Sequence, residues 1–248
     1  MKLISLNCER NKHLDLIVPF LHEEQPDVVC AQEVFRHDIP VIEAAFGAQA
    51  YFVPLLKILS ENTYHVPPLG EEGIAIFVSK KLIQRDFHFQ YYVQKNSEIP
   101  EFNGSNPNAI NRAVAWITVE KDGATFVLAD THFTWTPDGS ASDEQRANYV
   151  ALENVLQTIP EFVLCGDFNA PRGGEIFTAL AEKYADNIPS SVVTSIDPHI
   201  HRAGALQLMV DGMFSTPKYR VHDVRVVDGV SDHKAVVGEV ELKNTTAQ

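Results

Sequence analysis

The chain has 248 residues, of which 45% are hydrophobic and 21% charged, so it can build a sizeable core and is not a disordered protein. The net charge of −13 disfavours broad nonspecific binding of nucleic acid. It leaves a nucleic-acid substrate open, because acids that surround a metal ion raise the negative count without repelling the substrate. We expect one domain over residues 1–243, followed by a short polar tail over residues 244–248.

The predicted elements alternate between strands and helices, as in an α/β fold. A capping box at Ser142 and Gln145 marks the start of the second helix. In chain order the elements are strand Leu3–Leu6, helix Lys12–Glu24, strands Val28–Ala31, Gly73–Ser79, Arg85–Val93, Arg112–Glu120 and Thr125–Ala129, the helix after Ser142, strand Phe162–Cys165, helix Glu175–Lys183 and three strands between Leu206 and Leu242.

Two segments of the chain share one pattern, a strand, a helix and a second strand, with polar residues where the strands end. The first unit ends its strands at Asn7 and Glu33, and the second at His132 and Asp167. Ligands of open α/β sheets bind at the carboxyl ends of the strands. The repeat therefore predicts two sheets packed face to face, with helices outside and a polar site at one edge.

Neither the N-terminus nor the cysteines indicate export. No basic start, apolar stretch and small-residue cleavage site precede the first strand, and no stretch approaches the ~20 apolar residues that cross a bilayer. Cys8, Cys30 and Cys165 are expected to be small buried hydrophobic residues in a reducing compartment. We expect a cytoplasmic monomer.

An acid and an amide follow the strand Phe162–Cys165. Asp167 and Asn169 are two residues apart, so a continued strand would place both side chains on one side. The carboxylate can orient a water or a metal, and the amide can donate to a phosphate oxygen. The alternative is a turn in which both side chains bond to their own backbone.

A histidine and a buried acid stand near the C-terminal end. In Ser231-Asp232-His233 the imidazole can move a proton to or from water, although an exposed loop histidine is the ordinary alternative in a chain with 10 histidines. Asp211 lies in an apolar strand, where an unpaired carboxylate is costly, so we expect a partner for it and consider a histidine a good candidate.

Other polar residues lie at the ends of strands. Glu33 ends an apolar strand and suits Mg²⁺, or else it caps the helix that follows. Asn7 and Glu9 are expected to project together after the first strand. His132 can donate to a phosphate oxygen, and Arg112 can clamp a phosphate or stand as an exposed cation at a strand end.

Taken in order, these segments resemble the motif set of the endonuclease/exonuclease/phosphatase superfamily, which includes deoxyribonuclease I-like, apurinic endonuclease-like and neutral sphingomyelinase-like enzymes. The matching segments are Leu6-Asn7, Gln32-Glu33, Thr131-His132, Gly166-Asp167-Phe168-Asn169 and Ser231-Asp232-His233. The resemblance covers nearly the whole chain. It implies a four-layer α/β sandwich, in which helices flank two packed mixed sheets and the site lies in the cleft above them.

The resemblance also implies a metal site. Glu33 would be the principal ligand of Mg²⁺, with Mn²⁺ as a substitute. Asp232, Asn7 and Glu9 would lie close to the metal, although many relatives have Asp at the position of Glu9.

Catalytic and substrate-binding roles follow from the same resemblance. Asp167 and Asn169 would hold the attacking water and the phosphate, and His233 would act as general base or phosphate stabiliser. The remaining implied roles are Asp211 as the residue that orients His233, His132 as a phosphate contact paired with Glu72, and Asn7 and Arg112 as substrate-binding residues.

The expected activity is hydrolysis of a phosphodiester bond by direct attack of water, with nucleic acid as the first choice of substrate. The alternatives are a small phosphoester, such as a lipid headgroup, a nucleotide or an inositol phosphate, and an inactive binding protein on the same scaffold. The loops expected to select the substrate are Pro54–Gly70, Gln94–Asn111, Phe133–Ser142 and Ser190–Ala205. In the third loop, Phe133 and Trp135 can stack on a base or cover the edge of the core.

Overall fold

The computed structural model describes residues 1–62, 64–94, 97–102, 104 and 106–243, so the expected polar tail lies outside the described residues. In chain order the elements are β1 (Lys2–Asn7), α1 (Leu14–Glu24), β2 (Val28–Phe35), η1 (Arg36–Asp38), α2 (Ile39–Phe46), β3 (Ala48–Ile58), β4 (Gly70–Ser79), β5 (Ile83–Val93), β6 (Arg112–Lys121), β7 (Ala124–His132), α3 (Asp143–Leu156), β8 (Val163–Asp167), α4 (Glu175–Ala181), β9 (Ala185–Asp186), β10 (Asp211–Ser215), β11 (Tyr219–Val227) and β12 (Ala235–Leu242). Within this described part, no helix is long and apolar enough to cross a membrane.

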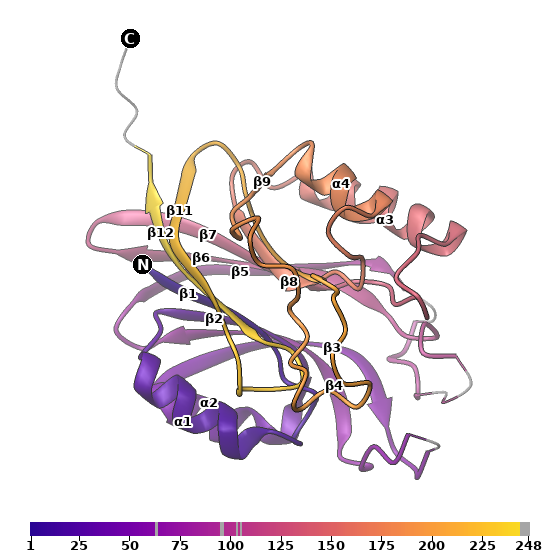
Figure 1. Ribbon diagram of the computed structural model, residues 1–248. Coiled ribbons are helices and arrows are strands. Elements are labelled where there is room, and N and C mark those ends of the chain that lie inside the picture. Colours follow the sequence, from indigo (N-terminus) through magenta and orange to yellow (C-terminus); the bar gives the residue numbers. More distant parts are fainter. Residues whose placement is uncertain (63, 95–96, 103, 105, 244–248) are drawn as a thin grey trace.

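The strands form two mixed sheets of six strands that pack face to face, with helices on both outer faces (Figure 1). The first sheet has the order β11-β12-β1-β2-β4-β3, and the second has the order β5-β6-β7-β8-β10-β9. Helices α1 and α2 cover the first sheet, and α3 and α4 cover the second. The predicted four-layer α/β sandwich is confirmed.

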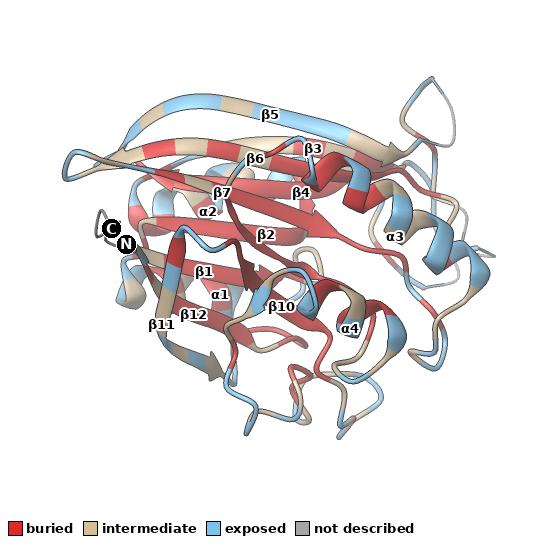
Figure 2. Ribbon diagram, turned by 90° about the horizontal axis from the view of Figure 1, so that it is seen from above, coloured by how far each residue is buried: buried red, intermediate tan, exposed pale blue. Residues whose placement is uncertain are grey.

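The alternation of side chains along each strand divides the core into layers. In β1, Leu3 faces the second sheet while Ile4 packs against the helices, and both are fully buried. Because both faces of the central strands are covered, their sequences are almost continuously apolar. Figure 2 shows these strands buried and the edge strand β5 largely exposed. The three cysteines are all buried, as expected.

The two predicted β-helix-β units are present. β1 pairs in parallel with β2, and β7 pairs in parallel with β8. Parallel strands end at the same edge of a sheet, so the polar residues near the ends of these four strands are brought to one region of the sandwich. Glu33 does not end its strand as predicted, because β2 continues to Phe35 and Glu33 lies where its register shifts, with φ 52°.

Helix α2 and strands β3 and β9 are absent from the predicted elements. The loop expected over Pro54–Gly70 begins within β3, which continues to Ile58. Proline removes a ladder hydrogen bond and usually ends a strand, yet it is tolerated on edge strands and at bulges. Pro54 occupies such a place, because β3 is the outer strand of its sheet and its register shifts between Pro54 and Leu56.

The predicted capping box is half present. Ser142 Oγ accepts a hydrogen bond from the Gln145 backbone N–H at 3.0 Å. The Gln145 side chain does not return to Ser142 but donates to the carbonyl oxygens of Thr134 and Asn169. The start of α3 therefore holds two loops that reach the polar edge of the sheets.

Candidate active site

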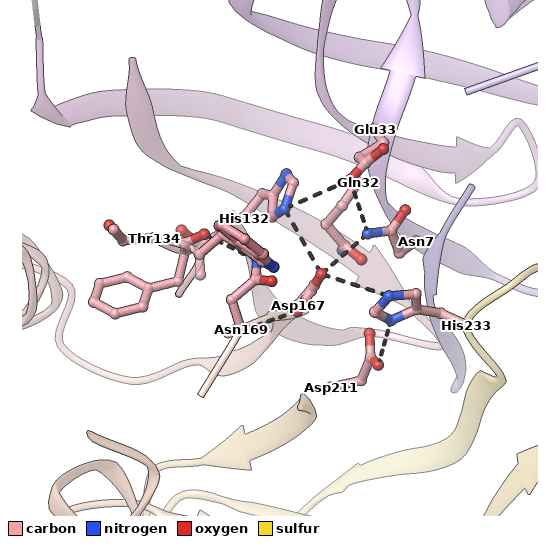
Figure 3. Close-up of polar contacts among 12 residues, drawn as sticks. Asn7, Gln32, Glu33, His132, Thr134, Asp167, Asn169, Asp211 and His233 are labelled. Carbon is pink, nitrogen blue, oxygen red and sulfur yellow. Dashed lines mark hydrogen bonds and ion pairs between the residues drawn. The ribbon is translucent and has the colours of Figure 1, made fainter. Parts of the chain in front are cut away.

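Polar side chains from both sheets converge on Asp167, the last residue of β8 (Figure 3). Its Oδ2 atom accepts a hydrogen bond from Asn7 Nδ2 at 3.0 Å. The same atom lies 3.7 Å from His132 Nε2 and 4.0 Å from His233 Nε2. Asp167 is buried, and burial raises its pKa above the ordinary value.

The His233 ring is oriented by Asp211, the first residue of β10. Asp211 Oδ2 lies 2.8 Å from His233 Nδ1, and both side chains are buried. The structure thus supplies the histidine partner that the apolar setting of Asp211 called for. Burial lowers the pKa of His233, but the facing carboxylates of Asp211 and Asp167 raise it well above its ordinary value. With Nδ1 turned to Asp211, Nε2 is turned to Asp167.

The loop between β9 and β10 braces this Asp–His pair, which the sequence did not indicate. Ser195 Oγ accepts hydrogen bonds from the backbone N–H groups of Val210 and Asp211 at 3.0 and 3.1 Å. The Asp197 backbone N–H donates to the carbonyl oxygen of Asp232 at 2.9 Å. One loop therefore fixes the segment before Asp211 and the segment that carries His233.

His132, at the end of β7, faces two carboxylates. Its Nε2 atom lies 3.7 Å from Asp167 Oδ2 and 3.9 Å from Glu33 Oε1. Burial, followed by the charge of Arg112, lowers the pKa of His132 to about 4, so the ring is neutral near pH 7. The predicted pairing of His132 with Glu72 is wrong, because the Glu72 carboxylate is held by Arg10 instead.

Arg10 is a residue of this site that the sequence analysis missed. Its guanidinium bridges two acids, with Nε 2.5 Å from Glu72 Oε2 and Nη1 2.9 Å from Glu33 Oε2. Burial raises the pKa of Glu33, but the charge of Arg10 and the histidines His132 and His233 lower it to about 2. Burial raises the pKa of Glu72 to about 7. Glu33 is therefore ionised at neutral pH.

A second group of acids lies beside Glu33. Ligand atoms of Glu9, His13 and Asp232 all lie within 4.8 Å of one another. Glu9 is bound by His13 at 2.8 Å and also by Lys12. Burial raises the pKa of Asp232 to about 6, and the negative charges of Glu9 and Glu33 add to this effect.

One pocket of about 230 Å³ collects most of the predicted residues. Glu33 and His233, which belong to distant parts of the chain, both line it. The predicted residues that line the pocket are Glu9, Glu33, Arg112, His132, Asp167, Asn169, Asp232 and His233. Asn7 and Asp211 lie behind this lining and contact Asp167 and His233.

Asn169 reaches the pocket by a different route from the one predicted. The strand ends at Asp167, and Asn169 has a left-handed backbone with φ 49°. Asp167 Oδ1 accepts a hydrogen bond from the Asn169 backbone N–H at 2.8 Å, and Asn169 Nδ2 donates to the Phe133 carbonyl at 3.1 Å. The argument from strand period is wrong here, since the segment turns after Asp167. The alternative holds for Asp167, whose side chain bonds the local backbone, but not for Asn169, whose side chain reaches Phe133.

Arg112 is a buried brace and not an exposed cation at a strand end. Its Nη1 donates to the His132 carbonyl at 3.1 Å, and its Nη2 donates to Asn108 Oδ1 at 3.2 Å. Burial lowers the pKa of Arg112. Its guanidinium links the end of β7 to the loop before β6 and still forms part of the pocket wall.

Unusual backbone conformations collect at this pocket. Among the described residues, eight that are not glycine have a positive φ, and four of these line the pocket: Glu9, Arg10, Glu33 and Asn169. Side chains with a Cβ rarely adopt this region, and such strain tends to cluster at functional sites. The backbone is therefore bent to direct these four side chains into one space.

The acids of the pocket suit a hard divalent cation. Carboxylate oxygens are the ligands that Mg²⁺ prefers, with water and phosphate oxygens completing its shell. Glu9, Glu33 and Asp232 raise one another's cost of ionisation, and a cation between them would relieve that repulsion. The acidic residues and His13 therefore form a candidate divalent-metal site.

Two packed sheets with acids, an Asp–His pair and a candidate metal site at their strand ends define a hydrolase of the α/β-sandwich class. The sequence pattern of the Endonuclease/Exonuclease/phosphatase family matches residues 4–233. The chain belongs to this family, whose members hydrolyse phosphate esters.

Individual relatives support the fold. The chain is 29% identical to Nocturnin of Drosophila melanogaster over 172 residues, which are 67% of this chain and 25% of that protein. It thus spans about a quarter of the length of this curated relative. The structure of an endonuclease/exonuclease/phosphatase from Bacteroides vulgatus is similar with a TM-score of 0.72 at 17% identity, covering 98% of both chains. The human Nocturnin catalytic domain with bound sulfate anion gives a TM-score of 0.70 at 18% identity, covering 98% of this chain and 93% of that one.

Proposed function

We propose that this protein is a Mg²⁺-dependent phosphoesterase that cleaves its substrate by direct attack of water. The observation that carries the proposal is the convergence of Glu33, Asp167 and His233 on one pocket. Such a pocket would bring a cation site, a carboxylate and an imidazole within reach of one phosphorus atom.

Glu33, Asp232, Glu9 and Asn7 would hold the metal. Glu33 is ionised and held by Arg10, while Asn7 lies between Glu33 and Asp167, with Nδ2 3.4 Å from Glu33 Oε1. A bound Mg²⁺ supplies charge neutralisation at the phosphate and at the leaving oxygen. Mn²⁺ offers the same oxygen preference and would substitute.

Asp167 is the better candidate for the residue that accepts the proton of the attacking water. Its Oδ2 atom lies within 4.0 Å of both site histidines and accepts a hydrogen bond from the neutral amide of Asn7. His233 lies between two carboxylates, an arrangement that keeps a proton on the ring. His233 would therefore stabilise the phosphate, with Asp211 as its positioning residue.

The remaining donors would stabilise negative charge on the phosphate oxygens. Asn169 and the neutral His132 line the pocket beside Asp167. Donors fixed before the reaction act strongly in a site with little water, because they need no reorganisation when charge develops. Both donors have fixed backbones, since Asn169 forms the turn described above and the His132 carbonyl is held by Arg112.

For the substrate, the sequence predicts nucleic acid as the first choice and a small phosphoester as the alternative. The third reading, an inactive scaffold, conflicts with a site in which the acids, both histidines and the amides are all in place. The single domain over residues 1–243, the monomeric state and the cytoplasmic location stay predictions.

A substrate screen with purified protein tests this function. The protein would be assayed with Mg²⁺ or Mn²⁺ on plasmid DNA, an abasic-site duplex, single-stranded RNA, sphingomyelin and bis-p-nitrophenyl phosphate. We expect metal-dependent hydrolysis that EDTA abolishes and that a His233→Ala variant lacks. Equal inactivity of the wild type and the variant on every substrate would overturn the proposal.

A further inference from the structure

Two exposed aromatic side chains line the pocket, beyond the polar residues of the proposed chemistry. Trp135 is 38% exposed and Tyr64 is 42% exposed, and both belong to the pocket wall. Phe133, two residues before Trp135, is fully buried and covers the edge of the core. The two alternatives for this loop were stacking on a base and covering the edge of the core. Phe133 covers the core, and of these two residues only Trp135 lines the pocket.

The backbone of Trp135 is held firmly although its ring is exposed. The Asn108 side chain accepts from the Trp135 backbone N–H at 3.2 Å and donates to its carbonyl oxygen at 2.9 Å. Asn108 is itself bound by Arg112, which also holds the His132 carbonyl. This chain of hydrogen bonds fixes the Trp135 backbone relative to the proposed phosphate site. The exposed indole that it carries can stack on a flat ring of a ligand.

Two further loops meet on the rim of the same pocket. The Arg202 guanidinium, between β9 and β10, lies 6.0 Å from the centre of the Tyr64 ring, between β3 and β4. These loops extend from different sheets and meet at the wall of the pocket. The contact adds a cation and a second aromatic ring to this wall.

Charge favours a short substrate. Arg10, Lys12, Arg112 and Arg202 line the pocket and nearly balance its five carboxylates, so that a bound divalent cation would make it positive. The rest of the chain carries almost all of the net charge of −13. A long polyanion would extend over this acidic exterior, whereas a small phosphoester meets only the pocket.

From these observations we infer that the substrate is a small phosphoester whose alcohol part carries a planar ring, and that this ring lies against Trp135. Aromatic side chains bind flat rings by stacking, which contributes a sizeable share of binding for each ring. The inference rests on the proposed phosphoesterase activity and adds the class of leaving group to it.

Matched substrates separate planarity from reactivity. Benzyl phosphate and cyclohexylmethyl phosphate release similar primary alcohols, but only benzyl alcohol carries a flat ring. Adenosine 5′-monophosphate and ribose 5-phosphate form a second pair. We expect the wild type to prefer the ring-bearing member of each pair in kcat/KM, measured as phosphate release with Mg²⁺. Trp135→Leu should lower this preference about 5- to 100-fold, while Trp116→Phe, outside the pocket, should leave it unchanged.

A binding measurement distinguishes failure of this inference from failure of the proposed hydrolysis. The chain has 2 tryptophans, so Trp116→Phe leaves Trp135 as the only indole reporter. Benzylphosphonate, which cannot be hydrolysed at its P–C bond, should quench this fluorescence at lower concentration than cyclohexylmethylphosphonate does. Quenching without turnover of any ester would refute the phosphoesterase and retain the ring site.

Three results would overturn the inference. The first is equal kcat/KM for the flat and non-flat members of both pairs. The second is equal quenching by the two phosphonates. The third is a higher kcat/KM for a 20-nucleotide oligonucleotide than for adenosine 5′-monophosphate, since a polymer would then be the better substrate.

Discussion

Two clusters at the pocket have the same composition, two carboxylates and one imidazole, but they differ in burial and bonding. In the first cluster, Asp167, Asp211 and His233 are all buried, and His233 lies between the two acids. In the second, Glu9 and His13 are partly exposed and only Asp232 is buried.

The difference shows how surroundings divide one set of groups between two tasks. In the buried cluster each imidazole nitrogen faces a carboxylate, so the ring is oriented and keeps its proton. In the open cluster the acids repel one another and Glu33, which favours an added positive charge such as a cation. The first cluster is suited to handling protons and the second to holding a metal.

The largest effect is expected from removing the imidazole of the buried cluster. His233→Ala should lower kcat by about 10²- to 10³-fold, because the phosphate loses a positioned donor. Steady-state kinetics on any substrate found in the screen would measure the loss. His222→Ala on β11, away from the pocket, is the matched control and should keep full activity. Retention of more than a tenth of the activity by His233→Ala would place the chemistry elsewhere.

The next largest effect is expected from removing the guanidinium of Arg10, which pairs with Glu33 and Glu72. Arg10→Met should lower the free energy of unfolding by about 3 kcal/mol, because Glu33 and the buried Glu72 lose their shared partner. Urea unfolding would measure it. Arg36→Met is the control, since Arg36 is 54% exposed and its pair with Glu71 should contribute less than about 1 kcal/mol. Equal losses from both variants would contradict the bridging role of Arg10.

A smaller effect separates the two clusters directly. Asp232→Asn should raise the Mg²⁺ concentration for half-maximal activity by about 10- to 100-fold, since one oxygen ligand loses its charge. Asp211→Asn should lower kcat and leave that concentration unchanged. Metal titrations of the two variants would test this pair of expectations. A similar shift in both would break the division of tasks between the clusters.

Some residues of this site could be predicted from the sequence, and others could not. Asn7, Glu33, His132 and Asp167 stand at or near the ends of apolar strands, and parallel pairing brings such positions to one edge, so their meeting was foreseeable. Arg10 was not foreseeable in the same way, because it lies after the strand with φ 65° and no periodicity governs its direction.

The pairings of charged residues were equally hard to predict. The sequence predicted His132 as the partner of Glu72, but the bend after β1 brings Arg10 to Glu72 instead. Asn169 also depends on a left-handed turn and not on strand alternation. Local patterns thus predicted the sheets and the site, while turns with positive φ decided which side chains touch.

The smallest effect concerns a buried acid that faces an amide instead of an imidazole. Asp130 Oδ1 accepts a hydrogen bond from Gln32 Nε2 at 2.6 Å, and burial raises the pKa of Asp130 well above its ordinary value. At a pH between the ordinary pKa of Asp130 in the unfolded chain and its raised pKa in the folded chain, the folded chain binds more protons. The free energy of unfolding therefore falls as pH rises, by up to about 1.4 kcal/mol per pH unit.

Asp130→Asn removes this proton and should flatten that slope. We expect the variant to be more stable than the wild type at pH 8, by about 1 kcal/mol or more, and to lose this advantage as the pH falls to about 3, below the ordinary pKa of an aspartate. Urea unfolding between pH 5 and 8 measures the slope. Asp211→Asn should have the opposite sign at pH 8, because it weakens the contact of 2.8 Å with His233. If Asp130→Asn kept the wild-type dependence of stability on pH, burial beside an amide would not keep a proton on Asp130. The contrast between the two clusters, which rests on the same effect of surroundings, would then lose its physical basis.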